Sequence, residues 1–122
     1  MTRFNFVKVP TRDLTAQSAF YEAAFGFAHR AAFENDEMEE VLVAQEGQDF
    51  QLCLMKLKTP PADAASIIGV IGFVTDDIDA ALLRALDAGA TLKQSVFAVD
   101  GIRIALVWDP EGNEIELVQF AA

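Results

Sequence analysis

Two stretches of the chain share one pattern: residues 7–14 read VKVPTRDL, and residues 71–78 read IGFVTDDI. In both, an alternating apolar segment ends at a threonine and runs into charged residues. Thr11 corresponds to Thr75, which is an offset of 64 residues. Self-similarity at a fixed spacing indicates that one supersecondary unit is repeated.

A helical pattern follows each stretch and stops at a glycine. The helices are predicted to end at Gly26 and Gly89, because glycine readily adopts the left-handed conformation that closes a helix. Asp13, Asp76 and Asp77 put negative charge near the helix N-termini, where unpaired N–H groups favour it. Steps of three and four predict one buried stripe per helix, with these members: Leu14, Ser18, Tyr21 and Phe25, with Phe20 and Ala24 beside them, then Ile78, Leu82, Ala85 and Leu86.

Three segments with strand character follow each helix. The order β-α-β-β-β therefore occurs twice, which predicts an α+β fold made of two βαβββ modules. We expect a single domain over residues 1–122, with modules at 1–58 and 66–122. Paired prolines resist helix and strand pairing, so TPPADA at 59–64 is the predicted linker. The predicted strands after the helices are 28–33, 38–45, 50–56, 91–96, 102–108 and 114–120, with hairpin turns at 45–49 and 109–113.

The composition is that of an acidic protein with enough apolar residues for a packed core. Of 122 residues, 52% are hydrophobic, and 19 acidic against 9 basic side chains give a formal net charge of −10. Nucleic acids and anionic membranes are disfavoured as partners, because both need a basic surface. The longest apolar run, 67–74, is too short to span a bilayer, and the start lacks the apolar stretch of a signal peptide. With a single cysteine, these features predict a cytoplasmic protein.

Residue parity sorts four strand segments into two faces, because side chains of one parity lie on one side of a sheet. One set is wholly apolar and is predicted to lie under the helices: Val7, Val9, Leu52, Leu54, Ile71, Phe73, Ile115 and Leu117. The other set is mixed: Phe6, Lys8, Gln51, Cys53, Met55, Val70, Gly72, Glu114, Glu116 and Val118. A mixed face can be an ordinary wetted surface. Its apolar members favour a small-molecule groove with a few polar groups.

These motifs resemble the vicinal-oxygen-chelate superfamily, which groups glyoxalases, bleomycin-resistance proteins and extradiol dioxygenases. The resemblance rests on TRDL at 11–14 with AFY at 19–21 and FGF at 25–27, GFVTDDIDA at 72–80, and WDPEGNEIEL at 108–117. It implies paired βαβββ modules that form an open, barrel-like cleft, and a homodimer. It also implies metal-ligand positions on the first and last strands of each module, which fall on Phe6, Cys53, Val70 and Glu116.

Only Glu116 among these four positions carries a ligand of the family's usual type. Phenylalanine and valine offer no lone pair, and Cys53 with Glu116 alone would make a weak site. Lys8 on the same face would also repel a cation. We therefore expect neither a metal nor another cofactor.

The candidate ligand-binding residues come mainly from the mixed face: Phe6, Lys8, Cys53, Met55, Val70, Gly72, Arg103 and Glu116. Glu116 is the candidate catalytic residue, as a general base; a counter-charge for a cationic ligand or a solvated carboxylate are the alternatives. No neighbour of Cys53 would lower the pKa of its thiol, so an inert residue is favoured. Arg103 could anchor a ligand's carboxylate or phosphate, or pair with Asp100 or Glu114.

Two polar features outside this set are interpreted as structural. The acidic run at 34–40 is typical of a solvated hairpin edge, with electrostatic guidance of a cationic partner as the alternative. His29 has no acidic or serine partner nearby in the sequence, which favours a structural role.

The leading functional hypothesis is a protein that binds a small aromatic or cationic molecule without a metal, as bleomycin-resistance members do. The alternative is an enzyme of the superfamily, a lyase, isomerase or dioxygenase, with a shifted or metal-independent site that uses Glu116 with Lys8 or Cys53. A dimeric interaction module without a small ligand is the third hypothesis.

Overall fold

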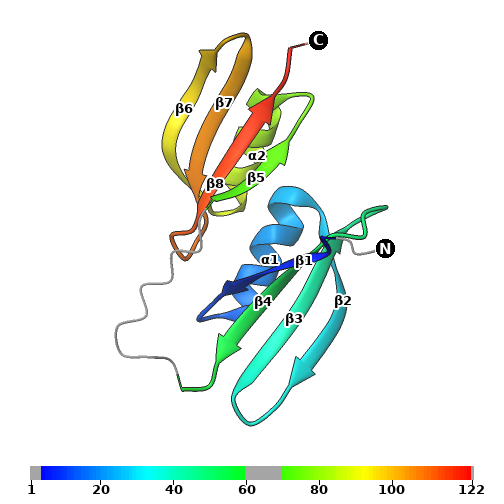
Figure 1. Ribbon diagram of the computed structural model, residues 1–122. Coiled ribbons are helices and arrows are strands. Elements are labelled where there is room, and N and C mark those ends of the chain that lie inside the picture. The colour runs from blue at the N-terminus through cyan, green and yellow to red at the C-terminus, as the bar shows by residue number, and fades with distance from the viewer. Residues whose placement is uncertain (1–3, 60–69, 122) are drawn as a thin grey trace. The chain divides into compact units, whose positions relative to one another are not determined.

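The computed structural model describes residues 4–59 and 70–121, and the chain divides into two compact units, Met1–Ser66 and Ile67–Ala122. Each unit has the order β-α-β-β-β, which confirms the α+β class and the two βαβββ modules (Figure 1). The predicted linker at 59–64 lies outside the described residues except for Thr59, and so does the predicted start of the second module at residue 66.

The first unit, unit 1, packs one helix against a four-stranded sheet. Its strands are ordered β1-β4-β3-β2, with β1 parallel to β4 and the other pairs antiparallel. Helix α1 contacts β2, β3 and β4 on one side of the sheet. The elements are β1 (Phe6–Pro10), α1 (Leu14–Phe25), β2 (Phe27–Glu34), β3 (Met38–Gln45) and β4 (Gln51–Leu57).

The second unit, unit 2, repeats this topology. Its strands are ordered β5-β8-β7-β6, with β5 parallel to β8, and α2 contacts β6, β7 and β8. No helix within the described ranges is long and apolar enough to cross a membrane. The elements are β5 (Val70–Val74), α2 (Ile78–Ala88), β6 (Thr91–Val99), β7 (Ile102–Trp108) and β8 (Glu114–Gln119).

Both helices begin and end as their sequences predict. The Asp13 side chain accepts a hydrogen bond from the Ala16 N–H at 3.0 Å, and Asp77 caps α2 in the same way at 3.1 Å from Ala80. Gly26 closes α1 in the left-handed region, at φ 72°, where a β-carbon would be strained.

The predicted apolar face forms most of the core. Its members on β4 and β8 are fully buried, and so is Val9 on β1, whereas Val7, Ile71 and Phe73 are half-buried. Within the described residues the helices contact the other three strands of each sheet and not β1 or β5, which leaves most residues of these two edge strands less covered.

The predicted helix stripes are partly wrong. In α1 Tyr21 is buried as predicted, and so are Phe20 and Ala24 beside it, whereas Leu14, Ser18 and Phe25 are half-buried and Gln17 is buried. The helix is therefore rotated by about one residue from the predicted stripe, and Gln17 takes a core position. In α2, Ile78 and Ala85 are buried as predicted, and Leu82 and Leu86 are half-buried.

The predicted bounds of β3 and β7 are confirmed, and those of the other strands that follow the helices differ by one to three residues. The largest difference is in β6, which continues to Val99 rather than ending at Val96. Asp100 and Gly101 both have positive φ, 52° and 80°, and a two-residue turn of this kind lets the strands pair up to its ends. Val99 accordingly pairs with Ile102.

A buried carboxylate holds the turn between β7 and β8. Asp109 is 3% exposed, and its Oδ1 accepts hydrogen bonds from the N–H groups of Glu111 and Asn113, both at 2.9 Å. Its Oδ2 accepts from Asn113 Nδ2 at 2.8 Å. These bonds fix the register in which Trp108 lies opposite Glu114.

Replacing this carboxylate should destabilise unit 2. The substitution Asp109→Ala leaves buried donors without an acceptor, which costs about 2 kcal/mol in the free energy of unfolding. Urea unfolding followed by circular dichroism measures the loss. Asp36→Ala, at an exposed position in the β2–β3 turn, is the control and should change stability by less than about 0.5 kcal/mol. Equal stability of the two variants would contradict the role assigned to Asp109.

Candidate functional site

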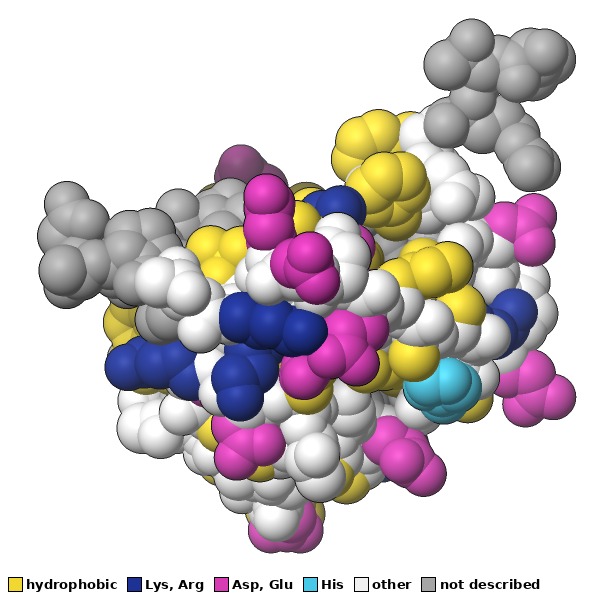
Figure 2. Space-filling model, turned by 90° about the horizontal axis from the view of Figure 1, so that it is seen from below, with side chains coloured by type: hydrophobic (Ala, Val, Ile, Leu, Met, Phe, Trp, Pro, Cys, Tyr) yellow, Lys and Arg dark blue, Asp and Glu magenta, His cyan; other side chains and the backbone are white. Residues whose placement is uncertain are grey.

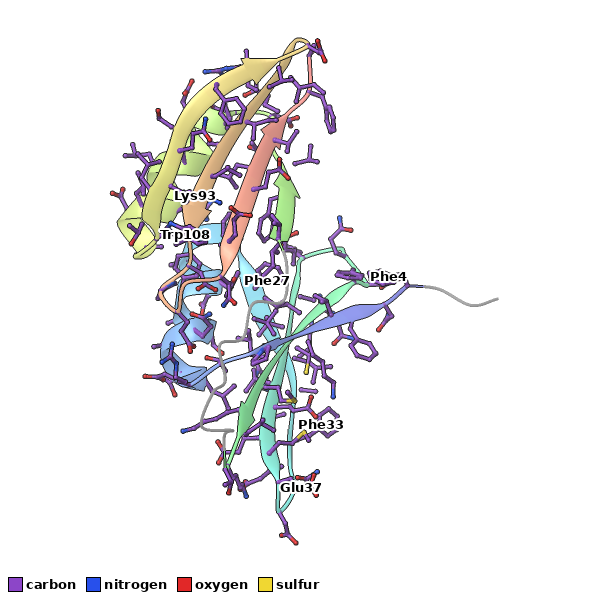
Figure 3. All side chains as sticks on the ribbon, turned by 60° about the vertical axis from the view of Figure 1, so that its left-hand side comes forward. Phe4, Phe27, Phe33, Glu37, Lys93 and Trp108 are labelled. Atoms are coloured by element: carbon purple, nitrogen blue, oxygen red, sulfur yellow. The ribbon has the colours of Figure 1, made fainter. Side chains whose placement is uncertain are left out.

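Each sheet has one side that carries the helix of its unit and one side that does not, which we call the helix-free face. The register of unit 1 places the residues of its helix-free face in three rows across β1, β4, β3 and β2. Figure 3 shows Phe4 and Phe33 projecting away from α1. The rows are Phe6–Gln51–Ala44–Ala28, Lys8–Cys53–Leu42–Ala31 and Pro10–Met55–Glu40–Phe33.

Three polar side chains meet on this face. Glu40 Oε2 accepts a hydrogen bond from the Cys53 thiol at 2.8 Å and lies 2.9 Å from Lys8 Nζ. The Glu40 side chain is only 15% exposed, whereas that of Lys8 is 43% exposed. Strand parity places Lys8 and Cys53 on one face, as observed, whereas the interpretation of the acidic run as a solvated edge is wrong for Glu40.

This cluster makes Cys53 a poor nucleophile. Burial, together with the hydrogen bond to the Glu40 carboxylate, raises the pKa of the Cys53 thiol to about 12. The same thiol and the Lys8 ammonium donate to Glu40 and hold the pKa of its carboxyl below the ordinary value. The hydrogen bond to Glu40 raises the pKa of Lys8. Glu40 and Lys8 are thus charged at neutral pH, and Cys53 is a neutral thiol.

Large aromatic side chains surround the cluster. Phe6 is 50% exposed and Phe33 is 60% exposed. Phe4 and Phe50 stack beyond the end of β1, with ring centroids 5.0 Å apart. Exposed aromatic groups beside one internally neutralised ion pair suit an apolar ligand that carries few charges.

The helix-free face of unit 2 also consists of three rows, and a gap lies in the middle one. Gly72 has no side chain, and a β-carbon built there would meet no described atom within 4 Å. Glu116 lies opposite Gly72 and is half-buried, and no hydrogen bond or ion pair joins its side chain to the described residues. The rows are Val70–Glu114–Trp108–Thr91, Gly72–Glu116–Leu106–Gln94 and Val74–Val118–Ile104–Phe97.

An aromatic and ionic cluster occupies the first of these rows. The Lys93 ammonium lies 4.6 Å from the centroid of the Trp108 ring and forms an ion pair with Glu114 (Figure 3). The Lys93 side chain is 37% exposed and that of Glu114 is 19% exposed. Lys93 is not among the candidate residues predicted from the sequence.

Arg103 lies on the other side of the unit 2 sheet, with α2. It pairs with Gln119, whose Oε1 accepts a hydrogen bond from the Ile78 N–H at 2.8 Å, and its guanidinium lies 3.3 Å from Asp79. Of the two alternatives given for Arg103, pairing with Asp100 or Glu114 is therefore wrong, because its partner is Asp79. Arg103 also does not share a face with Glu116.

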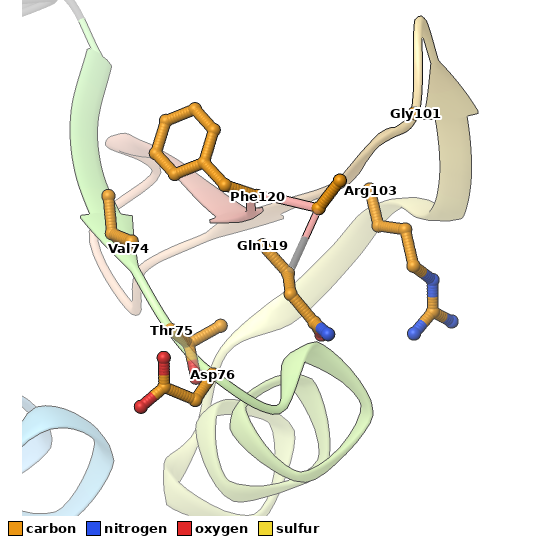
Figure 4. A pocket seen from close by; sticks show the side chains of 8 residues that line it. Val74, Thr75, Asp76, Gly101, Arg103, Gln119 and Phe120 are labelled. Atoms are coloured by element: carbon orange, nitrogen blue, oxygen red, sulfur yellow. The ribbon is translucent and has the colours of Figure 1, made fainter.

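A shallow pocket of about 480 Å³ lies beside Arg103 within unit 2. Its lining includes Val74, Asp76, Gln119 and Phe120 (Figure 4). Gln119 already caps α2 and Arg103 already binds Asp79, so two of its polar groups are engaged within the unit.

The remaining polar candidates lie on the surface. His29, the only histidine, is exposed on β2, and Figure 2 shows the histidine in cyan on a side of the molecule where cationic and acidic side chains adjoin. In the acidic run, Asn35 Oδ1 accepts from the N–H groups of Glu37 and Met38 and holds the β2–β3 turn. Glu34 forms an ion pair with Lys58 at 2.7 Å.

The predicted site residues thus fall into three places. Unit 1 carries Phe6, Lys8, Cys53 and Met55 on its helix-free face, and unit 2 carries Val70, Gly72 and Glu116 on its own. Arg103 lies beside α2. Within residues 4–59 and 70–121, no three His, Cys, Asp or Glu side chains are grouped as a metal site would require.

Comparison with solved structures identifies relatives that match nearly the whole chain. The antibiotic-binding protein TnmS3 from Streptomyces sp. CB03234 is 27% identical, with 99% of this chain and 98% of that chain covered and a TM-score of 0.80. A member of the glyoxalase/bleomycin resistance protein/dioxygenase superfamily from Sphaerobacter thermophilus DSM 20745 is 24% identical, with 98% of both chains covered and a TM-score of 0.80. Glyoxalase I from Zea mays is 20% identical, and the match covers 98% of this chain and 45% of that chain, with a TM-score of 0.82. No curated protein sequence matches this chain.

The family model of the Glyoxalase/Bleomycin resistance protein/Dioxygenase superfamily matches residues 3–117. This range covers every helix and strand of both units except the last two residues of β8. The chain therefore belongs to the glyoxalase/bleomycin resistance protein/dioxygenase superfamily.

Proposed function

We propose that this protein binds a small aromatic or cationic organic molecule on its helix-free faces, without a metal ion. The observation that carries the proposal is the pair Phe6 and Val70. The family resemblance assigns metal ligands to these two first-strand positions, and here they hold apolar side chains that are 50% and 52% exposed. Side chains of this kind offer contact area to an apolar ligand and no lone pair to a metal.

The other two ligand positions, Cys53 and Glu116, do not replace the metal ligands that are absent at Phe6 and Val70. The Cys53 thiol is protonated and donates to Glu40, whereas a metal-bound cysteine must be a thiolate. Glu116 alone remains as a ligand. The residues present do not fit a divalent ion of the family's usual kind, and no step of the proposed function uses one.

The similarity to TnmS3 supports a binding role, because that protein is described as antibiotic-binding and is 27% identical over nearly the full chain. The net charge of −10 favours a cationic or neutral ligand over an anionic one. We further propose that two copies of the chain associate, as the family resemblance implies.

Phe6 provides a direct test of this proposal. Phe6→Ala should weaken binding of proflavine, a planar aromatic cation, about tenfold, because the ligand loses the burial of one aromatic side chain. Isothermal titration calorimetry measures the affinity. Leu83→Ala is the matched control: Leu83 is 61% exposed on α2, away from the helix-free face, and its loss should leave the affinity unchanged.

The same titration tests two further parts of the proposal: that binding needs no metal ion, and that acidic groups attract the ligand. Affinity should be equal before and after dialysis against a chelator, and it should fall as salt rises, because screening weakens the attraction to acidic groups. A near-stoichiometric divalent ion that Glu116→Gln removes, or equal affinities for Phe6→Ala and the wild type, would overturn the proposal.

An enzyme of the superfamily with a metal-independent site is the second candidate function. The observation that favours it is Glu116, a half-buried carboxylate beside the gap at Gly72, with no polar partner among the described residues. A carboxylate in this setting can act as a general base on a bound substrate.

Glu116→Gln should abolish any such activity and leave the fold intact, because the amide keeps the shape and loses the proton acceptor. Turnover on a panel of lyase, isomerase and dioxygenase substrates, with circular dichroism of the variant, provides the measurement. Unchanged turnover in Glu116→Gln would remove this residue from the mechanism.

The environment of Cys53 predicts that it takes no nucleophilic part. Its pKa is raised from 9.0 to about 12, so at pH 8 the folded protein holds about a thousandfold less thiolate than an ordinary cysteine would. Alkylation by iodoacetamide, followed by mass spectrometry, should be correspondingly slow and should reach the ordinary rate in guanidinium. The alkylation rate reports on Cys53 alone, because the chain has one cysteine.

Glu40→Gln should speed this alkylation, because it removes a charge that disfavours the thiolate. Glu39→Gln, the neighbouring residue on the opposite face of β3, is the control and should react as the wild type does. Alkylation of the folded wild type at the unfolded rate would contradict the assignment and would favour the enzyme hypothesis.

A further inference from the structure

The cluster of Lys93, Trp108 and Glu114 has the chemistry of a site for an organic cation. The ammonium lies over an indole ring, at 4.6 Å from its centroid, and pairs with a carboxylate. An aromatic face next to a carboxylate is the combination that recognises alkylated ammonium groups. In this structure the occupant is the protein's own side chain.

An irregularity in β6 puts this side chain there. Leu92 pairs with Val107, and Gln94 pairs with Leu106, so Lys93 is an extra residue with no partner on β7. A bulge of this kind redirects a side chain. Lys93 thereby reaches the helix-free face, where Trp108 and Glu114 lie directly opposite each other on β7 and β8.

We propose that Trp108 and Glu114 form a subsite for an alkylated ammonium group of the ligand, which displaces Lys93 on binding. The inference rests on the proposed function, because it names the charged part of a small molecule bound on the helix-free face of unit 2. No covalent bond changes; one ammonium replaces another against the same ring and carboxylate.

The exchange is favoured by hydration. A lysine ammonium is compact and strongly hydrated, and its flexible stem returns it readily to water. A quaternary or tertiary alkylammonium is weakly hydrated and loses less on burial, and it binds aromatic faces well. The 37% exposure of the Lys93 side chain places it within reach of solvent already.

The neighbouring row indicates where the rest of the ligand lies. Glu116 follows Glu114 on the same face of β8, and the gap at Gly72 leaves space beside it. Beyond it, Ile104 and Val118 form an apolar row. The ligand class is therefore an organic cation with an apolar body, held by one ammonium at Trp108.

Trp108 is the only tryptophan in the chain, so its fluorescence reports on this subsite directly. Choline should change the emission of the intact protein in a saturable manner. Its uncharged isostere 3,3-dimethylbutan-1-ol, of nearly the same shape, should not do so at equal concentration.

Two substitutions test the displacement. Lys93→Met should raise the affinity for choline at least about threefold, because the internal competitor is gone. Arg84→Met removes the same charge from the exposed side of α2 and is the control. It should raise the affinity for choline by less than half as much. Glu114→Gln should weaken choline binding at least about fivefold. Circular dichroism checks that each variant is folded.

The inference is overturned if the uncharged isostere produces the same emission change, if choline produces none, or if Lys93→Met and Arg84→Met have equal effects. Each of these results is distinct from failure of the proposed function. Proflavine binding that depends on Phe6 would still support small-molecule binding, with the cationic group of the ligand bound at a position other than Trp108 and Glu114.

Discussion

The hydrogen bonds of the Asp109 carboxylate set the geometry on which the helix-free face of unit 2 depends. A strand pair that slipped by one residue would turn every side chain of β8 to the other face. Asp109 prevents this by accepting three hydrogen bonds within the β7–β8 turn while almost wholly buried. Trp108 immediately before the turn and Glu114 immediately after it consequently meet on one face, and Glu116 follows them there.

Much of the fold could be predicted because it depends on local rules. The aspartate caps, the closing glycines and the alternation of apolar residues each act over a few positions, and they locate both helices and the buried face. The rotation of α1 was missed because the predicted stripe gave Ser18 a core position that the structure gives to Gln17. A buried amide is rare enough that hydrophobic spacing does not select it.

The candidate site was predictable only where it follows strand parity. Parity places Lys8 with Cys53, and Gly72 with Glu116, as the register confirms. Glu40 was missed because it sits one row away on β3 and reaches its partners diagonally, which depends on strand order and not on sequence spacing. Lys93 was missed because a bulge shifts the register of β6, and no residue pattern in that stretch signals a bulge.

The middle row of the helix-free face occurs in both units of the repeat, but its residues differ in charge between the two units. Lys8 beside Cys53 in unit 1 occupies the place that Gly72 beside Glu116 occupies in unit 2, since both pairs join the middle of a first strand to the last strand of its unit. In unit 1 this row contains the Lys8 ammonium, which forms an ion pair with the Glu40 carboxylate of the same unit. In unit 2 glycine stands at the position of Lys8, and Glu116 stands at the position of Cys53. The middle row of unit 1 is thus closed by an ion pair within the unit, whereas the middle row of unit 2 leaves open space beside a carboxylate, so the two halves of the repeat present surfaces of different chemistry.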